Sequence, residues 1–247
     1  MTTADSTLTI VLVYPDLLGT YGDRGNLLAL QHRSRARGLP VRVVEVDPGD
    51  RVPSSADLYV LGGGEDGSQL LAAEALFAER GFRAALARGG VCLAVCAGFQ
   101  LLSETFTAPD GTTRAGLGAL DARCGRLSGA RAVGEVVAEA VALALPRLTG
   151  YENHQGDAVL GPAAQPLGRV LTGVGNGHDR SEGAVQDGVV ATYLHGPVLV
   201  RNPDLADHLL VRATGGPLPP FHDSAVERLR VERLAAAGHP DERKLTA

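Results

Sequence analysis

A cysteine at the end of an apolar segment stands where a nucleophile could form. The run 91–95 is apolar and rich in valine, Cys96 follows it, and the small residues Ala97 and Gly98 lead into a helical pattern. A strand, a tight turn and a helix in this order are typical of a nucleophile elbow, which holds the reactive side chain clear of the backbone. The helix start also favours the thiolate. The alternative is a buried core cysteine, the usual setting of a free thiol.

Two further segments could supply the remaining groups for thiol chemistry. An apolar run over 189–194 leads into His195, and another over 58–61 leads into the glycines of 62–64. Carboxyl ends of parallel strands meet at the ligand-binding edge of a sheet, so we expect these segments to converge with Cys96. One histidine can hold a thiolate and protonate a leaving group, and glycines bring backbone N–H groups close to an oxyanion. The alternatives are a strand cap for His195 and a simple strand-to-helix turn for the glycines.

The elements that must position these groups alternate between strand and helix. The strands and helices expected in the first part of the chain are, in order, 8–14, 23–37 (a helix capped by Asp23), 41–46, 58–61, 68–88 (a helix) and 91–95. This alternation predicts an α/β fold with an open, mostly parallel sheet and helices on both faces. Short apolar runs between glycines over 111–190 predict antiparallel strands and loops.

The remainder of the chain predicts helices. We expect them at 204–213 and 223–237, on either side of a glycine- and proline-rich breaker, with the last ten residues frayed. We therefore divide the chain into one domain over 1–215 and a C-terminal helical extension over 216–247.

Composition excludes several classes of function. The 247 residues carry a net charge of −5, which makes nucleic acid an improbable partner, and no run is long enough to span a membrane. Met1 to Ser6 is too polar to begin a signal peptide. The three cysteines lack the spacing of a disulfide framework or a zinc site, so we expect no metal. These features predict a cytoplasmic, reduced protein.

Other histidines and cysteines compete with the two candidates. His154 is the main alternative to His195, but no strong strand precedes it, which favours a structural or partner-contact role. His178 lies in a polar segment typical of a solvated loop. Cys92 falls inside a strand and Cys124 has no reactive pattern, so both are expected in the core.

The residues Val95-Cys96-Ala97-Gly98-Phe99-Gln100 resemble the nucleophile motif of class I glutamine amidotransferases. Those enzymes usually end their histidine motif with His-x-Glu, whereas His195-Gly196-Pro197 resembles the cobyric-acid-synthase-like branch, which lacks that glutamate. Ala94 departs from the glycine that many class I enzymes have. Further motifs of the branch lie at 21–26, 62–66, 126–129, 150–154 and 173–176, so the resemblance covers 8 to about 215.

The resemblance implies a flavodoxin-like three-layer fold and a mechanism. Cys96 would attack the carboxamide of L-glutamine, and His195 would protonate the departing ammonia and then activate water. The loop of Gly63 and Gly64 would lie at the oxyanion, with the N–H groups of Gly64 and Ala97 holding it.

Two more residues gain candidate roles from the same comparison. By analogy, Arg126 would hold a substrate carboxylate, with a surface salt bridge as the alternative. Gln100 lies one helical turn after Cys96 and could face the pocket, or it could serve helix packing.

The resemblance also implies what this chain lacks. A third residue normally orients a catalytic histidine, and no carboxylate for His195 is evident in the sequence. In the family that acid is thought to come from a synthetase subunit, so the isolated chain should be weakly active.

The ammonia needs an acceptor, and no segment resembles an ATP site. Within the branch, the motifs best match glutaminase subunits that work with a MurT-like Mur ligase. This implies a heterodimer in which ATP and Mg²⁺ bind the partner and the D-glutamate α-carboxyl of lipid II becomes D-isoglutamine at the inner face of the membrane. One alternative is a cobyrinic-acid-type or other carboxylic acid acceptor. Another is a catalytically silent subunit that stabilises a ligase.

Overall fold

A computed structural model describes residues 7–240, and its centre is a six-stranded sheet in the order β13-β14-β4-β3-β1-β2. Five strands run parallel and β13 is antiparallel. The strands are β1 (Leu8–Val13), β2 (Val41–Val46), β3 (Leu58–Leu61), β4 (Val91–Val95), β13 (Ala184–Gln186) and β14 (Val189–Thr192). Every residue of β1, β3, β4 and β14 is buried, which explains their continuous apolar sequences.

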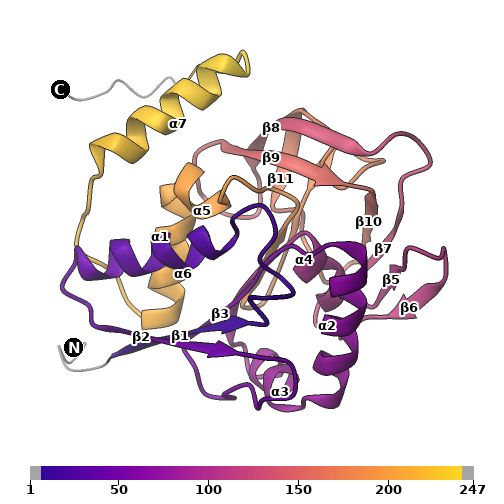
Figure 1. The fold of residues 1–247 in the computed structure, drawn as a ribbon. Helices are drawn as coiled ribbons and strands as arrows, with labels where there is room; N and C mark the ends of the chain where they lie inside the picture. Colours follow the sequence, from indigo (N-terminus) through magenta and orange to yellow (C-terminus); the bar gives the residue numbers. More distant parts are fainter. Residues whose placement is uncertain (1–6, 241–247) are drawn as a thin grey trace.

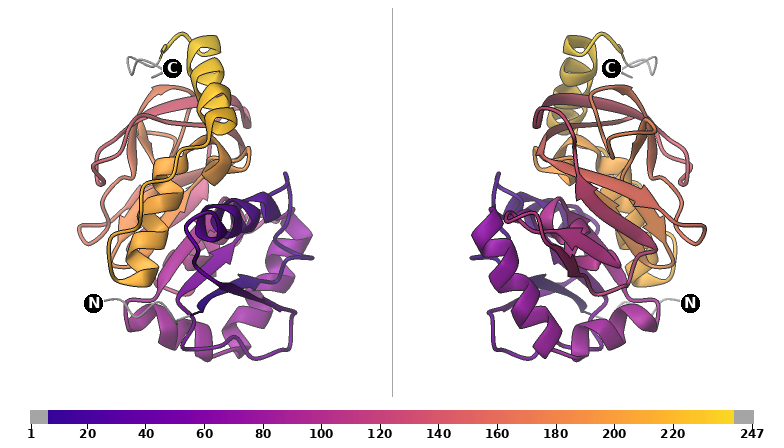
Figure 2. Two further views of the ribbon diagram at one scale, coloured as in Figure 1. Left: turned by 90° about the vertical axis from the view of Figure 1, so that its left-hand side faces the viewer. Right: turned by 90° about the vertical axis from the view of Figure 1, so that its right-hand side faces the viewer.

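Helices cover both faces of this sheet (Figures 1 and 2). One face carries α1 (Arg24–Arg35), α5 (Val198–Arg201) and α6 (Pro203–Thr214), and the other carries α2 (Asp66–Ala78), α3 (Gly81–Ala87) and α4 (Ala97–Leu102). The predicted α/β class with a mostly parallel sheet between helical layers is confirmed. None of the helices within 7–240 is both long and apolar enough to cross a bilayer.

One predicted helix is wrong in its extent. The segment 68–88 was expected to be continuous, but it forms α2 and α3 with a break at Glu79 and Arg80. The Glu79 carboxylate accepts hydrogen bonds from the N–H groups of Gly81 and Phe82, and so it begins a new helix. Helical spacing continues through the break, which is why the pattern concealed it.

The segment after α4 forms two smaller four-stranded sheets, in the orders β10-β7-β5-β6 and β12-β11-β8-β9. Their strands are β5 (Thr105–Thr107), β6 (Thr113–Ala115), β7 (Ala122–Arg126), β8 (Ala132–Ala140), β9 (Leu148–His154), β10 (Gly156–Leu160), β11 (Gly168–Thr172) and β12 (Ser181–Glu182). Most of their pairings are antiparallel, as predicted. Figure 1 shows β8 and β9 beyond the carboxyl ends of the parallel strands.

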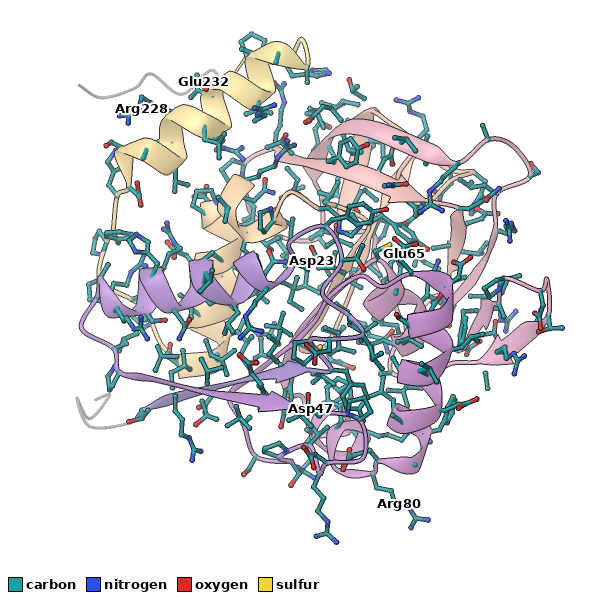
Figure 3. All side chains as sticks on the ribbon, viewed as in Figure 1. Asp23, Asp47, Glu65, Arg80, Arg228 and Glu232 are labelled. Carbon is teal, nitrogen blue, oxygen red and sulfur yellow. The ribbon has the colours of Figure 1, made fainter. Side chains whose placement is uncertain are left out.

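The last helix, α7 (Ser224–Ala236), lies on the outside of the molecule (Figure 1). The Asp223 side chain caps it by accepting hydrogen bonds from two N–H groups. Arg228 and Glu232 lie on its outer side in Figure 3 and are exposed. Leu234 is buried against the body. Of the last ten residues, for which fraying was expected, 241–247 lie outside the described part of the chain.

Candidate active site

The predicted strand–turn–helix around Cys96 is present, with β4 before it and α4 after it. Cys96 has φ +52° and ψ −103°, a conformation that residues with a side chain rarely adopt. Its N–H donates to the Thr192 carbonyl oxygen at 2.8 Å, which ties the turn to β14. At Gly98 an added Cβ would lie 2.9 Å from the Cβ of Leu61, so only glycine lets α4 pack this close. The elbow is therefore a strained turn held from two sides.

His195 follows β14 at the same edge of the sheet, and its backbone is fixed by β9. It exchanges two backbone hydrogen bonds with Tyr151, of 2.7 and 3.0 Å. The imidazole is 1% exposed. Gly63 lies against it, since a Cβ there would be 2.8 Å from His195 Cε1 and 3.4 Å from Cys96 Cβ. The thiol, the imidazole and the glycine loop therefore meet, as the sequence predicted.

A carboxylate of this chain orients His195. The Asp23 Oδ1 atom lies 3.2 Å from His195 Nδ1, and both side chains are 1% exposed. Asp23 Oδ2 accepts the Gly63 N–H at 2.7 Å. Because a carboxylate accepts, Nδ1 carries the proton and Nε2 is left for Cys96. In Figure 3, Asp23 lies inside the molecule between α1 and α2.

Electrostatics favour the protonated imidazole. Burial lowers the pKa of His195, but the contact with the Asp23 carboxylate and the proximity of Cys96 outweigh burial and raise that pKa to about 10. The cationic imidazole lies beside Cys96 and carries a proton that it can transfer. The arrangement can therefore support nucleophilic attack and supply the proton that a leaving amine needs.

Asp23 corrects two expectations from the sequence. It was assigned as the cap of α1, yet its side chain makes no cap hydrogen bond and reaches across to Gly63 and His195 instead. The sequence also suggested that no carboxylate in this chain orients His195. Local pattern favoured the cap, because Asp before a helix is the commonest capping signal. The available clue was its place in the motif Tyr21-Gly22-Asp23.

The glycine loop also differs in one detail from the expected oxyanion site. The Gly63 N–H donates to Asp23, so it holds the histidine's partner and is not available to an oxyanion. Gly64 and Ala97 line an open cleft next to Cys96. Close backbone packing explains the glycines, since a Cβ at Gly62 would lie 2.0 Å from the Leu18 carbonyl oxygen.

Both remaining candidates, Gln100 and Arg126, lie in the same cleft. Gln100 accepts a 2.6 Å hydrogen bond from Gln69 and lies 3.4 Å from the Tyr193 hydroxyl. Its side chain therefore both packs against neighbouring elements and lines the cleft. Arg126 is exposed, and its Nη2 donates to Gln155 at 3.0 Å. It makes no ion pair among residues 7–240, which leaves its charge available to a substrate carboxylate. The cleft is lined by Tyr21, Gly64, Glu65, Asp66, Gln69, Cys96, Ala97, Gln100, Thr107, Pro109, Gly125, Arg126, Arg131, Asn153, His154, Gln155 and Gly156.

His154, the alternative catalytic histidine, ends β9 and is buried. Its ring stacks on Tyr193 with centroids 3.8 Å apart, its Nδ1 lies 3.1 Å from the Gly156 carbonyl oxygen, and its Nε2 lies 3.5 Å from Glu152. These contacts support the structural role, because the ring is almost fully buried.

The remaining candidates, Cys92, Cys124 and His178, lie where the sequence placed them. Burial raises the pKa of Cys92 strongly and that of Cys124 to about 12, so both are inert core thiols. His178 is exposed and pairs with Asp157. Within 7–240, no three His, Cys, Asp or Glu side chains come together as a metal site.

Known proteins share this sequence and fold. The CobB/CobQ-like glutamine amidotransferase domain matches residues 9–203. The lipid II isoglutaminyl synthase (glutamine-hydrolyzing) subunit GatD of Staphylococcus aureus is 33% identical over 227 residues, which cover 89% of this chain and 90% of that protein. The subunit of the same name from Streptococcus pneumoniae is 34% identical over 209 residues, covering 83% and 80%.

A crystal structure of a glutamine amidotransferase has the same fold, with a TM-score of 0.59 at 22% identity, covering 82% of this chain and 98% of that one. Cys96 and His195 fall inside residues 9–203, which the domain family matches. This chain belongs to the family of CobB/CobQ-like glutamine amidotransferase domains.

Proposed function

We propose that this chain is the glutaminase subunit of an enzyme that amidates the D-glutamate α-carboxyl of lipid II. The observation that carries the proposal is the convergence of Cys96, His195 and Asp23 at the elbow. Similarity to GatD over most of both chains supports lipid II as the acceptor. Because the chain belongs to the CobB/CobQ-like family, the second acceptor to test is a cobyrinic-acid-type acid.

The proposed reaction begins with the Cys96 thiolate. It attacks the side-chain carbonyl carbon of L-glutamine, and the carbonyl oxygen becomes an oxyanion near the N–H groups of Gly64 and Ala97. His195 Nε2 gives its proton to the nitrogen as the carbon–nitrogen bond breaks, and ammonia leaves a glutamyl thioester. Neutral His195 then takes a proton from water, which attacks the thioester and releases glutamate and the thiol. Asp23 holds Nδ1 throughout.

Arg126 and Gln100 are proposed to orient the substrate. The Arg126 guanidinium, which forms no ion pair among residues 7–240, suits the α-carboxylate of glutamine, and Gln100 lines the same cleft. Neither group is proposed to take part in bond breaking.

The partner is proposed to be a MurT-like Mur ligase that binds ATP and Mg²⁺ and receives the ammonia. The chain itself would need no cofactor. Glutamine and ATP are cytoplasmic metabolites and lipid II is membrane-bound, so we place the reaction at the cytoplasmic face of the membrane.

The test is amidation of lipid II by the complex with ATP and either glutamine or ammonium chloride. Cys96→Ala should abolish glutamine-dependent amidation and leave ammonium-dependent amidation intact, whereas Cys92→Ala should preserve both. Glutamine-dependent activity in Cys96→Ala would overturn the catalytic role and favour a silent subunit. Failure to amidate lipid II, with a corrinoid acid amidated instead, would move the proposal to the second acceptor.

A further inference from the structure

One aromatic side chain, Tyr21, packs against the buried imidazole of His195. The ring of Tyr21 lies edge-on to the imidazole, with centroids 4.9 Å apart and an interplanar angle of 60°. Tyr21 is 40% exposed, whereas His195 is 1% exposed, so the tyrosine forms the outer wall of the imidazole's site. It also lines the cleft that contains Cys96.

The loop that carries Tyr21 is strained and fixed at its base. Tyr21 has φ +60°, a left-handed conformation that is unfavourable for a residue with a Cβ. The Thr20 N–H donates to the Gly63 carbonyl oxygen at 3.0 Å, and the Gly63 N–H donates to Asp23 at 2.7 Å. The same short turn therefore places Asp23 at one side of His195 and Tyr21 at another.

A residue of β9 holds Tyr21 in this position. Asn153 Nδ2 donates to the Tyr21 hydroxyl at 2.6 Å, across 132 residues of sequence. Arg131 Nε donates to Asn153 Oδ1, so the side-chain amide cannot turn over freely. Arg131 Nη2 also donates to the backbone carbonyl oxygen of Asn153 at 3.0 Å, which holds Arg131 in place. The amide nitrogen is thereby directed at the hydroxyl.

The strand β9 consequently fixes His195 in two ways. Tyr151 pairs with the His195 backbone, and Asn153, two residues later on the same strand, reaches its ring through Tyr21.

We propose that Tyr21 is a positioning residue for His195. Its ring excludes water from one side of the imidazole and keeps Nδ1 against Asp23, and the hydrogen bond from Asn153 latches the tyrosine in place. This inference rests on the proposed function, in which His195 transfers protons. Tyr21 itself exchanges no proton with the substrate.

The test compares Tyr21→Phe, Tyr21→Ala, Asn153→Ala and the Tyr21→Phe/Asn153→Ala double variant in the full complex. Tyr21→Phe and Asn153→Ala each remove the hydrogen bond between these two residues. Either change should lower kcat for glutamine hydrolysis by about threefold to tenfold. The double variant should be no slower than either single, because both remove the same bond. Tyr21→Ala should lower kcat further, and KM should stay within about twofold of the parent value in all four variants.

Nitrogen NMR of the His195 ring in the full chain gives a readout that does not depend on glutamine chemistry. The Nδ1–H signal should broaden or shift in Tyr21→Ala and Asn153→Ala. Tyr14→Phe is the matched control, because the buried Tyr14 hydroxyl has no hydrogen-bond partner within residues 7–240, and it should change neither readout.

Two results would overturn the proposal. One is an unchanged His195 signal and kcat with only the melting temperature lowered, which indicates a purely structural residue. The other is a raised KM at constant kcat, which indicates a substrate contact. Failure of the proposed function is seen separately, as glutamine hydrolysis that survives Cys96→Ala.

Discussion

Asp23 Oδ1 lies 3.2 Å from His195 Nδ1 although 172 residues separate them. The contact joins the turn before α1 to the end of β14, and both side chains are buried. A buried carboxylate on Nδ1 fixes the tautomer that leaves Nε2 facing the nucleophile. Asp23 therefore gives this chain an internal candidate for the group that the family resemblance assigned to a partner.

The first prediction concerns Asp23→Asn. The asparagine oxygen can still accept the Gly63 N–H, but an amide nitrogen facing Nδ1 favours the wrong tautomer, so kcat for glutamine hydrolysis should fall by about 10²- to 10⁴-fold. Steady-state kinetics in the complex measure this. Asp223→Asn, at the cap of α7, is the control and should keep its activity. Full activity in Asp23→Asn would mean that the orienting acid comes from elsewhere.

The second prediction is a pH dependence of stability from His195. Its pKa is raised from 6.5 to about 10 in the folded protein, mainly by Asp23 and Cys96 acting against burial. The folded state binds more protons between these values, so the stabilisation is complete below pH 6.5 and is lost as the pH rises towards 10. In this pH range the free energy of unfolding, measured with urea, should fall with each pH unit. The fall should be steeper than in His195→Gln by up to about 1.4 kcal/mol per pH unit. Equal slopes in both proteins would contradict the assigned pKa.

Much of the central architecture follows from local pattern. The strands of the parallel sheet are buried on both faces, so each reads as an unbroken apolar run, and turns rich in glycine mark the elbow and its neighbouring loop. Cys96 and His195 could be paired from sequence because both end such runs.

Contacts between distant segments were beyond local pattern. Asp23 carries a capping signature and Asn153 lies in a polar stretch, and neither reveals that β9 folds beside His195. The break between α2 and α3 was missed because the Glu79 cap interrupts the backbone without interrupting the helical spacing.

The third prediction tests Arg126 as a carboxylate ligand. Arg126→Ala should raise KM for glutamine by about tenfold or more while changing kcat little, because the contact is expected equally in the ground and transition states. Arg123→Ala is a matched control on the same strand, since Arg123 is exposed and pairs with Glu104 outside the cleft. An unchanged KM in Arg126→Ala would mean that Arg126 is a surface residue that does not contact the substrate.

The fourth prediction concerns the buried Glu182. Burial raises its pKa from 4.5 to about 7, and the nearby Glu152 adds to the increase, against hydrogen bonds from Thr192 and Tyr193. The folded state therefore binds more protons between 4.5 and 7, and this contribution to stability is lost as the pH rises through 7. Glu182→Gln should flatten the pH dependence of unfolding in this range and be the more stable protein above it. Greater loss of stability in the variant above pH 7 would contradict the prediction.

The last prediction tests the packing of the glycine loop. In Gly63→Ala the new Cβ would lie 2.8 Å from His195 Cε1 and 3.1 Å from Asp23 Oδ2, so it must displace the imidazole and crowd the carboxylate that holds it. Its distance to Cys96 Cβ, 3.4 Å, is an ordinary contact, so the imidazole moves relative to the thiol. Since a shift of about 1 Å can cost about a hundredfold in rate, kcat should fall by that order. Gly67→Ala is the matched control, because a Cβ at Gly67 meets nothing within 4 Å and lies in α2. Retained activity in Gly63→Ala, measured beside an active Gly67→Ala, would mean that the loop yields and that the spacing around His195 is not set by Gly63.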